Sequence, residues 1–152
     1  MSIEEDGTYK LIYMGTDLSA AYNSANKNAL TFTGTAMDTL LNTTFYGNLN
    51  DTSKKMVVSH EFNYGVGNVN RTTTSVRLSG LYENERQTKI TTKVGLMTLT
   101  DFFRASNSAN CTDSQTLNNV SGGSGNRCNE DNWLYKNGYE FLTFTPYNDV
   151  GG

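Results

Sequence analysis

The chain has 152 residues and a formal net charge of −3, and its lysines and arginines are scattered along the sequence. The lack of a basic stripe argues against nucleic-acid binding, which depends on clustered cations that neutralise phosphates. No apolar run reaches the roughly 20 residues that a membrane-spanning helix needs. A chain of this length is expected to fold as a single domain over residues 1–152.

The composition leans to Thr, Asn, Ser, Gly and Tyr, and only 18% of the residues are charged. Thr and Tyr favour strands, whereas Asn, Gly and Ser favour turns. This predicts an α+β fold with short antiparallel strands, one or two helices and long loops. Such a composition is typical of a secreted or cell-surface protein.

Near the start of the chain, alternating apolar residues predict a strand over Gly7–Met14 and a second short strand over Ala29–Thr33. The intervening segment Asp17–Lys27 fits either a short helix or an irregular loop.

The clearest helical pattern covers Thr35–Leu49. Its apolar residues recur at helical spacing on one face: Met37, Leu40, Leu41 and Phe45. Thr35 can cap the first turn, and Asp38 three residues later completes an approximate capping box. We expect this helix to pack one face against the core.

In the middle of the chain, Met56–Tyr64 is predicted to be a strand, entered from a turn at Asp51–Lys55. Asn70–Leu78 fits either an edge strand or an irregular excursion. Leu81–Gln87 fits a short helical turn, and Thr88–Met97 is predicted to be a further strand.

The stretch from residue 93 to residue 146 gathers both cysteines, the single tryptophan and the single proline. Thr98–Ala105 is predicted to be a short helix, capped by Thr98 or Thr100. The Asn137-Gly138 pair predicts a hairpin turn, and Tyr139–Thr145 predicts the last strand. Core residues are expected to include Leu96, Leu99, Phe102, Phe103, Trp133, Leu134 and either Phe141 or Leu142.

Cys111 and Cys128 enclose sixteen residues rich in Asn, Ser and Gly. Such a loop cannot order itself by burial, so a disulfide is expected, which would remove on the order of 3 kcal/mol of unfolded-state entropy. Two free buried thiols are the alternative. Two cysteines and the distant His60 are too few ligands for a metal site, and no cofactor is expected.

Candidate acids and bases are Asp101, Glu130, Asp131, Glu140 and His60. None of them lies in a known catalytic motif, so no catalytic residue is assigned and the chain is not expected to be an enzyme. His60 and Glu61 are neighbours on a predicted strand and should point to opposite faces. His60 is therefore expected to be a hydrogen-bonded structural residue.

Five segments, in this order, carry a family resemblance: GTYKLIY (7–13), MDTLLNTTFYGNL (37–49), MVVSHEFNYG (56–65), KVGLMTLTDFFRAS (93–106) and CNEDNWLY…EFLTFTP (128–146). The set resembles uncharacterised surface proteins of Gram-positive gut bacteria, some with a prepilin-type N-terminus. Their domain is similar to the sulfatase-modifying-factor and C-type-lectin-like families. The resemblance covers roughly residues 7–146 and implies a C-type-lectin-like fold.

The chain departs from this family at three places. The segment 141–146 replaces a strand that usually begins with tryptophan, and the copper-binding cysteine pair of formylglycine-generating enzymes has no counterpart. Family domains usually continue well past the proline, whereas this chain stops at Gly152. We therefore expect either a shortened chain or a fold that a neighbouring subunit completes by strand addition.

The resemblance, the polar surface and the expected disulfide favour an extracellular, non-enzymatic structural or adhesive module, such as a pilin-like subunit that self-assembles. The alternative is a lectin-like domain that binds glycans or a host surface. An enzyme is the third and least favoured class. The foremost ligand-binding candidates are Tyr135, Tyr139 and Tyr147, with further aromatic candidates at Tyr22, Tyr64, Tyr82 and Trp133.

Overall fold

The computed structural model describes residues 2–3, 6–13, 31–65, 77–114, 128–136 and 144–145. Over these residues the chain is a mixed α+β fold with short helices, short antiparallel strand pairs and one disulfide. This confirms the predicted α+β class. The single-domain organisation stays a prediction.

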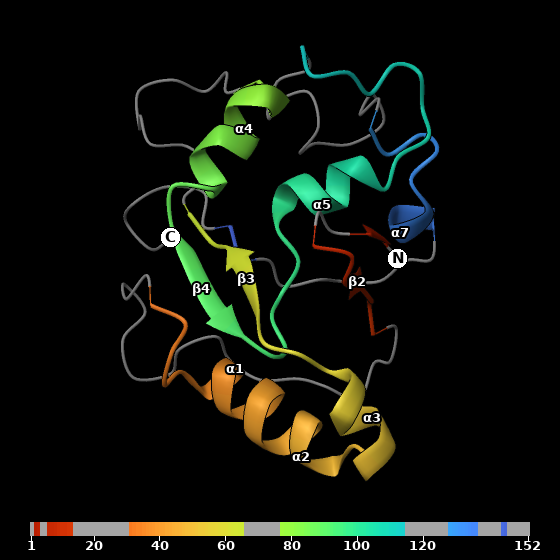
Figure 1. Cartoon of the computed structure of the whole chain (residues 1–152). Helices are drawn as coiled ribbons and strands as arrows, with labels where there is room; N and C mark the ends of the chain where they lie inside the picture. Colours follow the sequence, from red (N-terminus) through yellow and green to blue (C-terminus); the bar gives the residue numbers. More distant parts are fainter. Residues whose placement is uncertain are drawn as a thin grey trace.

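An antiparallel pair of strands lies at the centre of the described fold (Figure 1). The strands are β3 (His60–Asn63) and β4 (Lys89–Thr92), with Phe62 opposite Ile90. Both strands fall inside the predicted ranges 56–64 and 88–97 but are much shorter. Phe62 and Ile90 share the face that packs against the core.

A second strand pair involves the start of the chain. β1 (Ser2–Ile3) pairs with β2 (Tyr9–Lys10) in antiparallel register. Gly7, between them, has a φ of 80°, a backbone conformation that glycine adopts without strain. The predicted strand at 7–14 is thus confirmed for two residues only, and Leu11 and Tyr13 continue it as exposed, irregular chain.

One continuous helix covers residues 36–48, as predicted. It consists of α1 (Ala36–Asp38), the π-helical η1 (Thr39–Phe45) and α2 (Tyr46–Asn48). The Thr35 hydroxyl caps it by accepting the N–H of Asp38 at 3.1 Å. The Asp38 carboxylate accepts the Gly34 N–H instead of the Thr35 N–H, so the capping box is indeed approximate.

Residues 31–33, which precede this helix, form no strand, so that part of the prediction for 29–33 is wrong. The ambiguous segment 17–27 lies outside the described residues.

The next helices begin earlier or end later than their predicted counterparts. α3 (Asp51–Met56) includes Met56, which was predicted to start a strand, because the Asn50 side chain caps the helix by accepting the Ser53 N–H. α4 (Leu78–Glu85) begins three residues before the predicted turn at 81–87. Residues 70–76 lie outside the described residues, so the choice between a strand and a loop there stays open.

Two short helices lie close to the disulfide. α5 (Leu99–Arg104) has the predicted capping box, with Thr98 as its cap and Asp101 as the reciprocal residue. α7 (Trp133–Lys136) comes directly before the predicted turn. The Asn132 carboxamide oxygen accepts the N–H groups of Leu134 and Tyr135 and so caps the start of this helix. The turn predicted at Asn137-Gly138 lies outside the described residues.

Phe144 and Thr145, the described end of the predicted last strand, form no strand. Residues 137–143 lie outside the described part of the chain, and the predicted core residues Phe141 and Leu142 are among them.

The core consists of two groups of buried side chains. The α4–α5 cluster comprises Leu78, Leu81, Phe103 and Cys128, with Leu99, Phe102 and Cys111 packed against it. The Phe144 cluster comprises Phe32, Met37, Leu41 and Phe144, with Leu40, Phe62, Tyr64, Ile90, Val94 and Leu96 packed against it. In Figure 1, α4 and α5 lie beyond one end of the β3–β4 pair, and the helix at 36–48 lies beyond the other.

Most of the predicted core residues are confirmed by these clusters, and Leu134 is fully buried. Trp133 is an exception, because 39% of its surface is exposed. Neighbouring helical residues are about 100° apart, so the burial of Leu134 turns Trp133 toward the surface. The prediction that Trp133 belongs to the core is therefore wrong.

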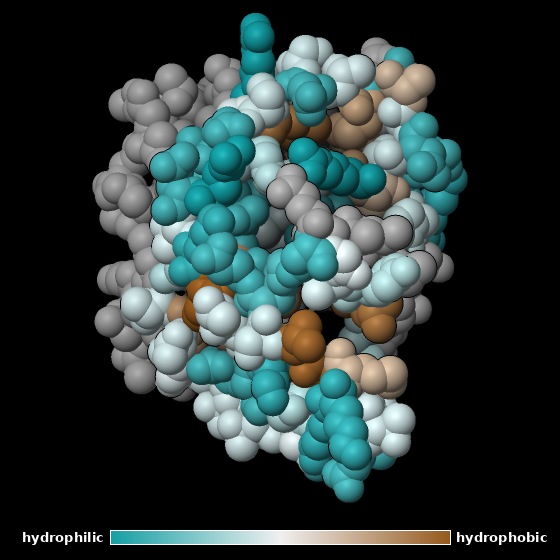
Figure 2. Space-filling model, viewed as in Figure 1, coloured by the Kyte–Doolittle hydropathy of each residue, from teal (hydrophilic) through white to brown (hydrophobic). Residues whose placement is uncertain are grey.

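The face seen in Figure 2 is largely hydrophilic, and hydrophobic residues show through at separate spots. Within the described segments, no helix combines the length and the apolar character needed to cross a bilayer.

Candidate functional site

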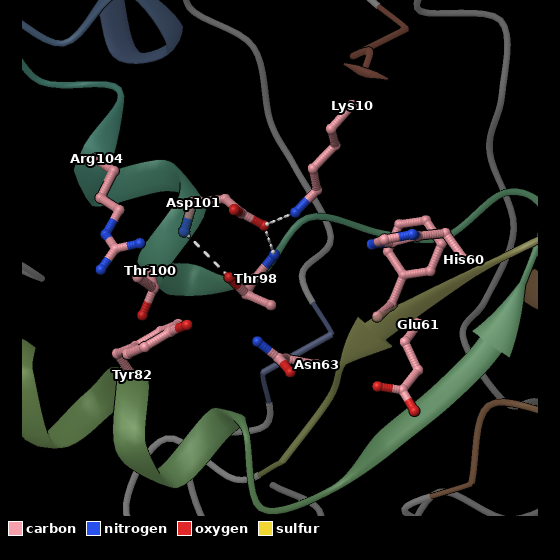
Figure 3. A pocket seen from close by; sticks show the side chains of 10 residues that line it. Lys10, His60, Glu61, Asn63, Tyr82, Thr98, Thr100, Asp101 and Arg104 are labelled. Atoms are coloured by element: carbon pink, nitrogen blue, oxygen red, sulfur yellow. Dashed lines mark hydrogen bonds and ion pairs between the residues drawn. The ribbon is translucent and has the colours of Figure 1, made fainter. Parts of the chain in front are cut away.

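A small pocket opens between β3, α4 and α5, next to Lys10 of β2 (Figure 3). It encloses about 70 Å³. Most of its lining residues are polar or charged. The full lining consists of Lys10, His60, Glu61, Phe62, Asn63, Tyr82, Thr98, Thr100, Asp101 and Arg104. These residues come from four elements that are far apart in the sequence.

One wall of the pocket is fixed by the capping box of α5. The Asp101 carboxylate accepts the Thr98 N–H at 2.9 Å, and the Asp101 N–H donates to the Thr98 hydroxyl at 3.1 Å. Lys10 donates to the same carboxylate at 2.8 Å. Asp101 is therefore held from both sides, as the dashed lines in Figure 3 show, and it ties β2 to α5.

The opposite wall comes from β3. Glu61 forms an ion pair with Lys89 of β4, with 2.7 Å between Oε2 and Nζ. The Nδ1 atom of His60 lies 3.5 Å from the Asp6 carboxylate. The two neighbours thus contact different partners, and the structural role expected of His60 stays a prediction. Hydrogen bonds from the hydroxyl and the N–H of Thr8 lower the pKa of Asp6.

An arginine and a tyrosine form the third side. The Arg104 guanidinium carbon lies 4.7 Å from the centroid of the Tyr82 ring, a cation–π contact. Arg86 lies over the same ring at 5.6 Å and also pairs with Glu83 at 3.3 Å. Arg104 has no ion-pair partner among the residues that the structure describes.

A buried carboxyl group lies behind the pocket, at the end of α4. Glu85 is completely buried, and its Oε1 atom accepts the Thr100 N–H at 3.2 Å and the Thr145 hydroxyl at 2.6 Å. Burial raises the pKa of Glu85, while these hydrogen bonds and the nearby Thr100 hydroxyl lower it. Among the described residues, neither that hydroxyl nor the Glu85 Oε2 atom has a partner with hydrogen-bond geometry.

The predicted disulfide between Cys111 and Cys128 is present, with 2.01 Å between the sulfur atoms. The alternative of two free thiols is thereby excluded. Cys128 is fully buried in the α4–α5 cluster, and Cys111 packs against the same cluster. The bridge therefore anchors both ends of the loop to the core.

The other predicted acids have local partners. Glu130 accepts hydrogen bonds from Ser108 and Asn110, and Asp131 pairs with Lys136. They do not line the pocket, whereas Asp101 and His60 do. Glu140 lies outside the described residues.

The predicted aromatic candidates are dispersed. Tyr135 is 53% exposed on α7 and does not line the pocket. Tyr82 lines the pocket, and Tyr64 packs against the Phe144 cluster. Three candidates lie outside the described residues: Tyr22, Tyr139 and Tyr147.

Sequence reasoning missed Lys10, Asn63, Thr100 and Arg104 as members of a shared site. One local signal was available, because Thr100 and Arg104 are four residues apart and share a face of α5. Lys10 lies 91 residues from its partner Asp101, a pairing without any local signal.

In the described part of the chain, no three His, Cys, Asp or Glu side chains gather in a way that could hold a metal ion. No protein-family model, curated protein or solved structure matches the chain.

Proposed function

We propose that the chain is a non-enzymatic, extracellular structural or adhesive module, such as a pilin-like or filament subunit on a bacterial surface. The observation that carries this proposal is the disulfide between Cys111 and Cys128. Structural disulfides persist in oxidising environments outside the cytoplasm. The ordered family resemblance over residues 7–146 supports the same location and a C-type-lectin-like fold.

Exposed apolar and aromatic side chains support an adhesive role. Trp133 and Tyr135 flank the buried Leu134 on α7, five and seven residues after Cys128. Tryptophan and tyrosine are enriched where proteins bind partners, because they combine a large apolar surface with a polar tip. The disulfide holds the segment that displays these two side chains.

Assembly through strand addition is part of this proposal. β1 and β2 form a pair of strands, and exposed Tyr9, Leu11 and Tyr13 line the chain at and after β2. Unpaired edge strands readily add a strand from another chain. A neighbouring copy is the partner that a filament subunit requires.

The test is the size of the oxidised protein over a wide concentration range, measured by analytical ultracentrifugation. We expect association at high concentration, and weaker association for Leu11→Lys. Met56→Lys is the matched control, because Met56 is 71% exposed and Leu11 is 74% exposed. A monomer at every concentration would contradict assembly.

A second candidate function is lectin-like binding of a saccharide, favoured by the pocket beside Tyr82. Its polar lining can exchange hydrogen bonds with sugar hydroxyls, and the edge of the tyrosine ring offers an apolar surface. A glycan array probed with the oxidised protein tests this function. An array without any bound glycan counts against it.

A further inference from the structure

We propose that the pocket between β3, α4 and α5 binds the carboxylate of an acidic saccharide, with Arg104 as the residue that recognises the charge. This inference rests on the second candidate function, saccharide binding, and specifies the chemical class of the ligand. Three observations on the described residues carry it: a positive charge without an ion pair among them, a guanidinium that contacts a tyrosine ring, and a buried hydroxyl without hydrogen-bond geometry to any of them.

The first observation concerns the charges that line the pocket. Lys10 is neutralised by Asp101 at 2.8 Å, and Glu61 is neutralised by Lys89 at 2.7 Å. Arg104 remains, and it has neither an ion pair nor a hydrogen bond with the residues the structure describes. The pocket therefore offers one uncompensated positive charge, which an anionic ligand would match.

The second observation is that the Tyr82 ring holds the Arg104 guanidinium. The group lies 4.7 Å from the ring centroid, so its planar fork is oriented before a ligand arrives. A guanidinium can donate two parallel N–H bonds to a carboxylate, a geometry that the ammonium group of lysine cannot reproduce. Pre-orientation lowers the entropic cost of forming those two bonds.

The third observation is an unpartnered polar group in the wall. Thr100 is only 7% exposed and lines the pocket, and its hydroxyl lies near the Glu85 carboxyl but lacks hydrogen-bond geometry to any described residue. In Figure 3 the hydroxyl points toward the Tyr82 ring, on the side where Arg104 lies, and the Asn63 carboxamide faces the same opening. Buried polar groups normally form hydrogen bonds. A ligand hydroxyl that bonds the Thr100 hydroxyl would therefore remove the free-energy cost of leaving it without one.

The size of the pocket limits what can enter. A volume of about 70 Å³ holds a group of a few heavy atoms, such as a carboxylate with the carbon that bears it. The remainder of a sugar ring would lie outside, where the edge of Tyr82 and the Asn63 carboxamide can contact its hydroxyl groups. A uronic acid, with a carboxylate at the edge of its ring, has this shape.

The inference is tested by NMR titration of the oxidised full chain with glucuronate, glucose and acetate, each to millimolar concentration. We expect glucuronate to shift the backbone signals of Asn63 and Thr100 and the Nε signal of Arg104. Glucose and acetate should each bind at least about tenfold more weakly, because each lacks one of the two sets of contacts.

Variants locate the site. Arg104→Gln should weaken glucuronate binding about tenfold or more and leave glucose binding unchanged. Arg86→Gln is the matched control, because Arg86 also lies over Tyr82 but does not line the pocket. It should bind glucuronate as the wild type does. Both arginines are exposed, so both variants should melt at the wild-type temperature.

The other outcomes distinguish recognition of the carboxylate from binding of the saccharide. Equal binding of glucuronate and glucose, unaffected by Arg104→Gln, would overturn recognition of the carboxylate and leave saccharide binding standing. Acetate binding as tight as that of glucuronate would overturn the saccharide and keep the carboxylate site. Titrations without any shifted signal would overturn both.

Discussion

The Thr145 hydroxyl donates a 2.6 Å hydrogen bond to the Glu85 carboxyl group, across 60 residues of sequence. The same hydroxyl accepts the Leu99 N–H at 2.9 Å, and Glu85 also accepts the Thr100 N–H at 3.2 Å. The end of α4, the first turn of α5 and the segment 144–145 therefore meet at one buried carboxyl group.

Glu85→Gln should stabilise the protein at neutral pH. Burial raises the pKa of Glu85 above its ordinary value of 4.5, so the stability that the protonated carboxyl contributes is complete below that value. It is lost as the pH rises through the folded-state pKa. The glutamine amide is neutral at every pH, so it avoids the cost of burying a charge.

The measurement for this variant is the difference in melting temperature between variant and wild type across the pH range. The difference should be largest near neutral pH, should shrink as the pH falls through the raised folded-state pKa, and should be constant below 4.5. Glu83→Gln, exposed on the same helix, is the control and should show no such trend. A difference independent of pH would contradict the assigned cause.

Thr145→Val should lower the free energy of unfolding by about 1–3 kcal/mol. The substitution keeps the shape of the side chain but removes one donor and one acceptor in a buried position. Chemical denaturation measures the loss. Thr91→Val, at an exposed position of β4, should change the free energy by less than about 0.5 kcal/mol. Equal effects at the two positions would show that the Thr145 bonds contribute nothing.

Removal of the disulfide by Cys128→Ser should lower the free energy of unfolding by about 3 kcal/mol under oxidising conditions, because the cross-link restricts the unfolded chain. Cys111→Ser should have a similar effect without placing a hydroxyl at a fully buried site. Wild-type protein in reducing agent should melt as the variants do. An unchanged melting temperature in both variants would mean that the bridge does not stabilise the fold.

Gly95→Ala should destabilise the protein by about 1–3 kcal/mol, because there is no room for a methyl group. An added Cβ atom would lie 2.7 Å from the Phe144 ring and 3.0 Å from the Phe62 ring. Gly47→Ala is the matched control, because a Cβ atom there has open space within the helix. It should stabilise by about 0.5–1 kcal/mol. In thermal melts, Gly95→Ala should lower the melting temperature and Gly47→Ala should raise it.

Asn42→Asp should destabilise the contact between the helix at 36–48 and the chain after β4. The Asn42 carboxamide donates to the Val94 carbonyl at 2.9 Å and accepts the Val94 N–H at 3.0 Å. Aspartate loses the donor and adds a negative charge beside Asp38. The expected loss is about 1–3 kcal/mol. Hydrogen exchange at the Val94 N–H should accelerate in this variant. An unchanged exchange rate would show that the two hydrogen bonds between Asn42 and Val94 do not hold these segments together.

Sequence reasoning succeeded where the cause of a structure is local. The cap at Thr35, the apolar face of Met37 and Leu41, and the Thr98–Asp101 capping box all act within a few residues. The disulfide followed from the composition of the loop that it closes. Such features depend on neighbouring residues, so their patterns can be recognised before the fold is known.

Sequence reasoning failed where two local signals compete or where burial decides. Met56 was expected to start a strand, but the cap formed by Asn50 begins α3, which includes Met56. Trp133 was expected in the core, but Leu134 occupies that side of the helix. Neither outcome can be predicted without knowing which surface the segment packs against.

By itself, the sequence determined the α+β class, the main helix, the short helix α5 and the two cysteines that bond. Only the tertiary structure decided that Lys10 neutralises Asp101 and that Arg104, over Tyr82, has no ion-pair partner among the described residues. The physical reason is separation along the chain. Capping and periodicity act over a few residues, whereas the charge balance of the pocket depends on residues that only packing brings together.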